Sequence, residues 1–330
     1  MMKKRIGIIG SGSWATALAK IILNREKQVN WYFRKPENIE LFKRYHNNPN
    51  YLRVVKFDTT KINFYTDVNE IVKRSDIILL AIPSAFIHQS LIGLKEDISK
   101  KMVVSAVKGV IPETNQTPGQ YLHNRFNVPY NRFCAIVGPC HAEEVAMERL
   151  SFLTIACKNL STAHDFASIL ECDYIKMKVS DDITGMEYSS VLKNIIAIAS
   201  GIVHGLDYGD NFQAILISNA INEIERFVDK AYPIVRDISN PVYLGDLLVT
   251  AYSQFSRNRV FGTMIGKGYS ITSAQLEMRM IAEGYYATKS IHKINEKYKV
   301  DLPICDAVYE ILYDKTDPAI VIKNLIEKLR

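Results

Sequence analysis

Residues 6–23 read IGIIGSGSWATALAKIIL, a short apolar run followed by glycines and then an amphipathic stretch. The run predicts a buried strand, and the segment after it predicts a helix. Gly10, Gly12 and Ala15 follow the spacing G-x-G-x-x-A. In that pattern the first glycine makes a tight turn, the second lets the backbone approach a pyrophosphate, and the third small residue lets helix and strand pack closely. Because a helix N-terminus also favours an anion, this stretch predicts a dinucleotide site.

The chain up to about residue 180 continues the same alternation of apolar runs and amphipathic segments. The runs predicted as strands are 4–10, 30–34, 62–66, 76–83, 101–109, 133–139, 153–157 and 174–179. Apolar strands separated by helices are typical of a mainly parallel sheet covered on both faces. We therefore predict an N-terminal α/β domain over residues 1–180, a Rossmann-type doubly wound sheet that binds NAD(P).

After residue 180 the strand pattern stops. Helices are predicted at 183–204, 211–231, 242–252, 273–299 and near 318–329, and prolines within 231–241 separate two of them. We expect residues 181–330 to form an all-helical C-terminal domain that binds the substrate and carries the catalytic groups.

Composition and charge exclude several classes of protein. The 330 residues carry 41 Lys+Arg and 35 Asp+Glu, a net charge of +6 that is too mild to indicate nucleic-acid binding. No stretch approaches the length of about 18 apolar residues that a membrane span needs, and the apolar run near the N-terminus is too short for a secretory signal. The five cysteines contain no CxxC pair and the histidines fit no metal spacing, so we expect no metal site and a cytoplasmic location.

The end of the second predicted strand bears on which dinucleotide binds. NAD-selective domains usually have Asp or Glu there, which binds the ribose 2′-OH. This chain reads NWYFRKPENIE, with Arg34 and Lys35 in that place. An arginine can bind a 2′-phosphate, although Arg34 could instead stack on adenine or extend into solvent. The sequence favours NADP(H), with NAD(H) as the alternative.

Three stretches outside the glycine motif carry groups suited to reducing a carbonyl. SAVKG places Lys108 at the carboxyl end of a predicted strand, where open α/β sheets bind ligands. In SSVLKNIIAIASGIVHG (189–205), Lys193 lies on a narrow helical stripe that either meets water or lines a cleft. The run 244–262, LGDLLVTAYSQFSRNRVFG, is either an exposed charged loop or a phosphate site, because arginines, amides and hydroxyls bind phosphate oxygens.

Taken together, the chain resembles bacterial NAD(P)-dependent glycerol-3-phosphate dehydrogenase. The resemblance runs nearly end to end, through GSGSWATALA, AVKG, GPCHAEEVA, VLKNIIAIASGI, GDLLVT, SRNRVFG and IAEGYYATKSI. It implies the reversible, NAD(P)H-dependent reduction of dihydroxyacetone phosphate to sn-glycerol 3-phosphate, which supplies the backbone of glycerophospholipids. By analogy, the apolar surfaces of the helical domain also suggest a homodimer.

The resemblance implies roles at the matching positions. Lys193 would be the catalytic proton donor and acceptor, and Lys108 and Asp246 would complete the catalytic set. The implied cofactor contacts are Gly10, Gly12, Ser13, Trp14, Arg34, Lys108, Ala142, Arg257, Ile281 and Glu283. The implied substrate contacts are Lys108, Gly138, Cys140, Lys193, Asp246, Thr250, Ser256, Arg257 and Asn258.

The loop at residues 138–142 departs from the family pattern. Cys140 replaces a hydroxyl residue, and His141 replaces a common phenylalanine. Because a thiol is a weak hydrogen-bond donor, backbone amides of this loop would have to supply any strong contact to the substrate. A catalytic pair of Cys140 and His141 is disfavoured, because adjacent side chains on an extended segment point apart.

Two other functions fit part of the pattern. One is another two-domain dehydrogenase that acts on a hydroxy acid or sugar acid, which would also need an anion site and a lysine. The other is a redox sensor that binds NADP(H) without turnover. Lys108, Lys193 and Asp246 argue against the sensor, because a sensor needs no proton donor.

Overall fold

The computed structural model describes residues 4–278 and 282–329. The chain divides into two compact units. The sheet unit comprises Met1–Val107 and Pro118–Ile183, and the helical unit comprises Lys108–Thr117 and Thr184–Arg330. The short segment Lys108–Thr117, which lies within the range predicted for the first domain, thus groups with the helices.

The sheet unit contains one eight-stranded sheet within the described residues, in the order β3-β2-β1-β4-β5-β6-β7-β8. Strands β1 to β6 pair in parallel, β7 runs antiparallel to β6, and β8 runs parallel to β7. The prediction of a mainly parallel, Rossmann-type sheet is confirmed. The strands are β1 (Ile6–Ile9), β2 (Val29–Tyr32), β3 (Ile62–Tyr65), β4 (Ile77–Leu80), β5 (Met102–Ser105), β6 (Phe133–Val137), β7 (Ser151–Ala156) and β8 (Ile175–Ser180).

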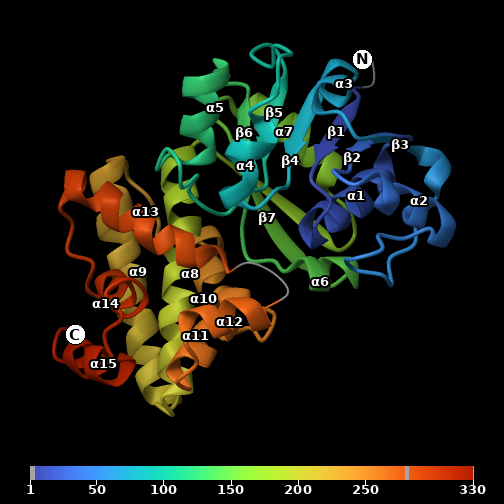
Figure 1. The fold of residues 1–330 in the computed structure, drawn as a ribbon. Helices are drawn as coiled ribbons and strands as arrows, with labels where there is room; N and C mark the ends of the chain where they lie inside the picture. The colour runs from blue at the N-terminus through green and yellow to red at the C-terminus, as the bar shows by residue number, and fades with distance from the viewer. Residues whose placement is uncertain (1–3, 279–281, 330) are drawn as a thin grey trace. The chain divides into compact units, whose positions relative to one another are not determined.

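Helices separate most of these strands along the chain and pack against the sheet (Figure 1). The central strands β1, β4 and β5 read IGII, IILL and MVVS and are buried at every position, as expected for strands covered on both faces. The helices of this unit are α1 (Ser13–Arg25), α2 (Pro36–Tyr45), α3 (Val68–Lys73), α4 (Ser84–Leu91), α5 (Pro118–Phe126), α6 (Ala142–Ala146) and α7 (Leu160–Leu170), with a 3-10 turn at Thr59–Lys61.

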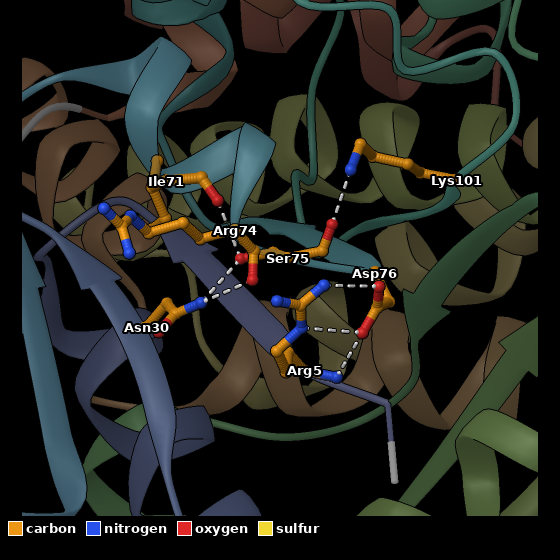
Figure 2. A network of polar contacts seen from close by, with 7 residues as sticks. All are labelled: Arg5, Asn30, Ile71, Arg74, Ser75, Asp76 and Lys101. Carbon is orange, nitrogen blue, oxygen red and sulfur yellow. Dashed lines mark hydrogen bonds and ion pairs between the residues drawn. The ribbon is translucent and has the colours of Figure 1, made fainter. Parts of the chain in front are cut away.

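A polar network fixes the turn between α3 and β4 at the amino edge of the sheet (Figure 2). Asn30 Nδ2 donates to Ser75 Oγ at 2.9 Å, and Lys101 Nζ donates to Ser75 O at 2.6 Å. Asp76 accepts from both the backbone and the guanidinium of Arg5, which holds the pKa of Asp76 below its usual range. These bonds tie together the starts of β1, β4 and β5, at the edge opposite the glycine motif.

The helical unit is built around α8 (Ile183–Gly205), in which residues 185–203 are all buried. Most of these buried residues are apolar and form part of the core of this unit, and Figure 1 shows α8 among its neighbouring helices. The other helices are α9 (Asp210–Ala231), α10 (Asp246–Tyr252), α11 (Arg257–Gly266), α12 (Ile271–Glu277), α13 (Glu283–Tyr298), α14 (Pro303–Leu312) and α15 (Pro318–Ile326). A π-helical turn, Pro241–Gly245, precedes α10. No helix in the described part of the chain is long and apolar enough to cross a membrane.

Glycines bring α8 and α11 into backbone contact. A Cβ at Gly262 would lie 2.1 Å from Ile198 O, and a Cβ at Gly201 would lie 2.0 Å from Arg259 O. Any larger residue at these positions would force the helices apart. The contact therefore fixes the start of α11 beside the middle of α8, where Lys193 lies.

Candidate active site

The glycine motif lies between β1 and α1 of the sheet unit. Gly10 has a φ of +127°, and a Cβ there would lie 2.2 Å from Ala81 O, directly after β4. Both the backbone conformation and the lack of space require glycine. The strand order reverses between β1 and β4, and open α/β sheets bind their ligands outside the carboxyl ends of the strands at such a reversal.

The N-terminus of α1 opens onto free space. Gly12 is the N-cap of α1, and a Cβ there would meet nothing within 4 Å. The first turn of α1 contains no acidic residue. Ser13 and Trp14 begin the helix, and the buried Trp14 Nε1 has no hydrogen-bond partner among the described residues. The N-terminus of α1 therefore fits the pyrophosphate of a dinucleotide, because helix N-termini bind such anions through backbone N–H groups.

Other predicted contacts lie along the same carboxyl edge of the sheet. Arg34 is exposed and follows β2, the strand beside β1. Gly138 follows β6 with a φ of +127°, and a Cβ there would lie 2.9 Å from Phe152 O. Cys140 is half-buried, and Ala142 begins α6. The sheet unit thus gathers all the contacts predicted within it at one edge.

The helical unit contains a cluster of two lysine amino groups and one carboxylate, in which Lys193 and Asp246 are buried and Lys108 is half-buried. Lys193 and Asp246 are 3% and 2% exposed, and Lys193 Nζ forms an ion pair with Asp246 Oδ1. Lys108 Nζ lies 3.6 Å from the same oxygen. The alternative in which Lys193 extends into water is therefore wrong. With both lysines protonated, the cluster carries a net positive charge, which favours an anionic ligand.

Asp246 is the first residue of α10, directly after the π-helical turn. Asn240 Oδ1 accepts from Val242 N at 3.3 Å and so caps this turn. Thr250 lies one helical turn after Asp246, and its hydroxyl donates to Asp246 O at 2.6 Å. Asp246 Oδ2 is buried and has no hydrogen-bond partner among the described residues. That oxygen is available to accept a hydrogen bond from a bound hydroxyl group.

The SRNRVFG run forms the start of α11, so the alternative of an exposed loop is wrong. Ser256 is the N-cap and accepts from Arg259 N at 3.3 Å. Arg257 is the first helical residue, and the first turn contains no acidic residue. A helix N-terminus that also carries an arginine favours an anion.

Asn258 is buried, and its amide bonds within the protein. Its Nδ2 donates to Asn194 Oδ1 at 2.9 Å, and its Oδ1 accepts from Gly284 N at 2.9 Å. Glu283 begins α13 next to Gly284, whereas the predicted contact Ile281 lies outside the described residues. Asn194 was not predicted as a site residue, and its position beside Lys193 in VLKN was the only signal for it.

Comparisons with known proteins identify the family of the chain. Residues 5–163 match the sequence model described as NAD-dependent glycerol-3-phosphate dehydrogenase N-terminus, and residues 182–323 match the model of the C-terminus. The chain belongs to this family. The expected fold class and family are therefore confirmed.

Relatives within the glycerol-3-phosphate dehydrogenase family match over nearly the whole chain. The enzyme named glycerol-3-phosphate dehydrogenase (NAD(P)+) from Staphylococcus epidermidis is 32% identical over 98% of both chains. The protein of the same name from Limosilactobacillus reuteri is 31% identical over 99% of this chain and 98% of its own. The crystal structure of glycerol-3-phosphate dehydrogenase from Coxiella burnetii is similar with a TM-score of 0.87, at 28% identity, over 98% of this chain and 99% of that one.

The part of the chain that the structure describes contains no group of three or more His, Cys, Asp or Glu side chains placed to hold a metal ion. All five cysteines are free.

Proposed function

We propose that the chain catalyses the reversible, NAD(P)H-dependent reduction of dihydroxyacetone phosphate to sn-glycerol 3-phosphate. The observation that carries this proposal is the buried ion pair between Lys193 and Asp246, with Lys108 at the same carboxylate oxygen. Membership of the family indicates the reaction, and Lys193 in this cluster is a suitable proton donor for it.

The proton and the hydride reach different atoms of the ketone. When bound, the nicotinamide would supply a hydride to the carbonyl carbon. We assign to the Lys193 ammonium the proton that the ketone oxygen takes up, which leaves a neutral amine and an alcohol. In the oxidative direction the neutral amine takes the proton back. Asp246 holds Lys193 Nζ in place, and Lys108 would stabilise negative charge that develops on the oxygen.

We assign the substrate phosphate to the N-terminus of α11. Ser256 and Arg257 supply a hydroxyl and a guanidinium there, and Asn258 contributes the second hydrogen of its Nδ2 group. Thr250 lies one helical turn after Asp246 and donates to its backbone oxygen. Cys140 offers only a weak donor, so we assign the backbone amides after Gly138 to any strong contact from that loop.

We assign the dinucleotide to the carboxyl edge of the sheet, with Gly10, Gly12, Ser13 and Trp14 around the pyrophosphate. The exposed guanidinium of Arg34 favours NADP(H). Arg34→Asp should therefore shift the preference from NADPH toward NADH, because a carboxylate repels a 2′-phosphate and accepts from a 2′-OH. An unchanged ratio of kcat/KM for the two cofactors would show that another group binds the 2′-phosphate.

The roles that we propose for the two domains are those expected from the sequence. We propose residues 1–180 as the NAD(P)-binding domain and residues 181–330 as the substrate-binding and catalytic domain, with the segment Lys108–Thr117 serving the latter. We also propose a homodimer, which sedimentation velocity would test, and a cytoplasmic location. The five free thiols support a reducing compartment.

The reaction is tested by mixing the purified protein with dihydroxyacetone phosphate and following nicotinamide absorbance, once with NADPH and once with NADH. We expect rapid oxidation, faster with NADPH. Oxidation only with a hydroxy-acid or sugar-acid precursor would support the other dehydrogenase. Cofactor binding without oxidation by any keto substrate would support a sensor.

A further inference from the structure

Asn194 lies beside Lys193 on α8 and is 6% exposed. Its Nδ2 donates to the backbone oxygen of Lys108 at 2.8 Å, and its Oδ1 accepts from Asn258 Nδ2 at 2.9 Å. Lys108 belongs to a stretch without helix or strand. Its backbone carbonyl is therefore held by a side chain rather than by regular secondary structure.

The hydrogen bonds continue beyond Asn258. Asn258 Oδ1 accepts from Gly284 N at 2.9 Å, at the start of α13. The three bonds run in one direction, from Gly284 N through Asn258 and Asn194 to Lys108 O. We call this chain of bonds the amide relay. Bonds that share a buried amide in this way polarise and strengthen one another.

The elements that carry the amide relay are in close contact. A Cβ at Gly284 would lie 2.5 Å from Asn194 O, so the backbones of α13 and α8 meet there. The start of α11 is fixed against α8 by Gly262 and Gly201. Asn194 and Asn258 therefore have little freedom to move, and the position of the Lys108 carbonyl follows from theirs.

We propose that Asn194 is a positioning residue that, through the amide relay, holds Lys108 beside Asp246. This inference rests on the proposed function, in which Lys108 contacts the reacting atoms. At 3.6 Å, the contact between Lys108 Nζ and Asp246 Oδ1 is an ion pair without a short hydrogen bond. A small displacement of the Lys108 backbone would move the ammonium away, and misplacing a catalytic group by about 1 Å can cost about a hundredfold in rate.

Single substitutions cut the amide relay at different bonds. Asn194→Leu and Asn194→Asp both remove the donor to Lys108 O, one without and one with an added charge. Asn258→Asp keeps the acceptor for Gly284 N and removes the donor to Asn194. Asn295→Asp is the matched control, because Asn295 on α13 donates to Val300 O at 2.8 Å and accepts from Val300 N at 2.9 Å outside the amide relay.

The first readout is steady-state kinetics with dihydroxyacetone phosphate and NADPH. We expect both Asn194 variants to lower kcat about tenfold or more, which corresponds to one lost positioning hydrogen bond. We expect Asn295→Asp to leave kcat unchanged. Asn258→Asp also removes the hydrogen that we assign to the substrate phosphate, so its effect on the amide relay is read from the labelling rate of Lys108, which should rise as in the Asn194 variants.

The second readout does not depend on turnover. Reductive methylation with formaldehyde and borohydride, followed by peptide mass spectrometry, gives the labelling rate of Lys108. We expect that rate to rise about threefold or more in both Asn194 variants and to stay unchanged in Asn295→Asp. An inactive wild-type protein that still shows this rise would reject the proposed function and keep the amide relay. Unchanged Lys108 labelling, or an unchanged kcat in both Asn194 variants of an active enzyme, would overturn the inference.

Discussion

Lys193 is an ammonium on a helix that is buried on every side, and Asp246 compensates its charge. The helical periodicity of the sequence placed Lys193 on a stripe of small and polar residues but could not show that this stripe is buried. The partner could be predicted only through the family resemblance, because Asp246 lies 53 positions away along the chain. Asn194 was missed for a related reason, since both of its bonding partners are distant in sequence.

Substitutions at the two glycines of the nucleotide motif should affect different properties, NADPH binding at Gly12 and stability at Gly10. Gly12→Ala places a methyl group in open space at a backbone conformation that any residue adopts. Gly10→Ala places one 2.2 Å from Ala81 O at positive φ. We expect Gly12→Ala to keep the thermal midpoint within about 2 °C and to weaken NADPH binding about tenfold or more. Gly10→Ala should lower the midpoint strongly, because overpacking costs about 1–3 kcal/mol or more. Equal effects of the two variants on stability would contradict this assignment.

Helices α11 and α14 were not predicted from the periodicity of the sequence, and both contain residues that disfavour helices. The α11 segment contains Gly262 and Gly266, which lower helix propensity, yet those glycines permit its contact with α8. The α14 segment begins with Pro303, a residue that breaks a helix in the interior but suits its first turn. The sequence pattern also predicted a single helix over residues 273–299. That prediction is wrong, because α12 ends at Glu277 and α13 begins at Glu283.

Gly262→Ala tests the contact between α8 and α11. The added Cβ would lie 2.1 Å from Ile198 O, so α11 has to shift. We expect a loss of about 1–3 kcal/mol in the free energy of unfolding, together with a raised KM for dihydroxyacetone phosphate. Gly268→Ala is not a suitable control because of its positive φ, whereas Gly209→Ala meets no neighbour within 4 Å. Equal behaviour of Gly262→Ala and Gly209→Ala would contradict the close contact.

Glu223 on α9 couples the stability of the helical unit to pH. It accepts from Ile304 N and Cys305 N at the start of α14, at 3.0 and 2.9 Å. Burial nevertheless raises the pKa of Glu223 to about 7, from 4.5. The folded state therefore holds the proton more tightly than the unfolded state. This contribution to stability is present at low pH and is lost as the pH rises from about 4.5 to about 7.

Glu223→Gln removes that titration. Relative to this variant, the wild-type protein should lose about 3 kcal/mol of stability between pH 4.5 and pH 8, because each pKa unit corresponds to about 1.4 kcal/mol. Thermal midpoints of both proteins at pH 4.5 and pH 8 measure the change. A difference between the two midpoints that does not vary with pH would show that Glu223 does not titrate in this range.

For the whole molecule, alternating apolar runs and helices were enough to predict the α/β sheet and the later change to helices. They could not predict that β7 reverses direction, because an apolar run carries no information about strand polarity. Nor could they predict that Lys108–Thr117 groups with the helical unit. That segment begins at Lys108, shortly after β5 ends at Ser105. Its attachment depends on distant contacts such as Thr117 Oγ1 to Glu187 Oε2 at 2.7 Å.

Thr117→Val tests this attachment. The change keeps the volume but removes the hydroxyl that donates to the buried Glu187 carboxylate. We expect a loss of about 1–3 kcal/mol in the free energy of unfolding, as for other hydrogen bonds to buried charged groups. Thr288→Val is the matched control, because the buried Thr288 hydroxyl donates to the backbone of its own helix, at Gly284 O. A larger loss in the control would argue against the attachment.

The central claim is that this chain reduces dihydroxyacetone phosphate with a proton from Lys193. The most direct measurement quantifies sn-glycerol 3-phosphate formed and NADPH consumed by the wild-type protein and by Lys193→Ala, alongside the NADPH dissociation constant of each. We predict equal amounts of product and oxidised cofactor in the wild type. In the variant we predict a kcat lower by about 10²–10⁴-fold, with nearly unchanged NADPH affinity. A wild-type protein that forms no sn-glycerol 3-phosphate, or a variant that forms it at the wild-type rate, would contradict the claim.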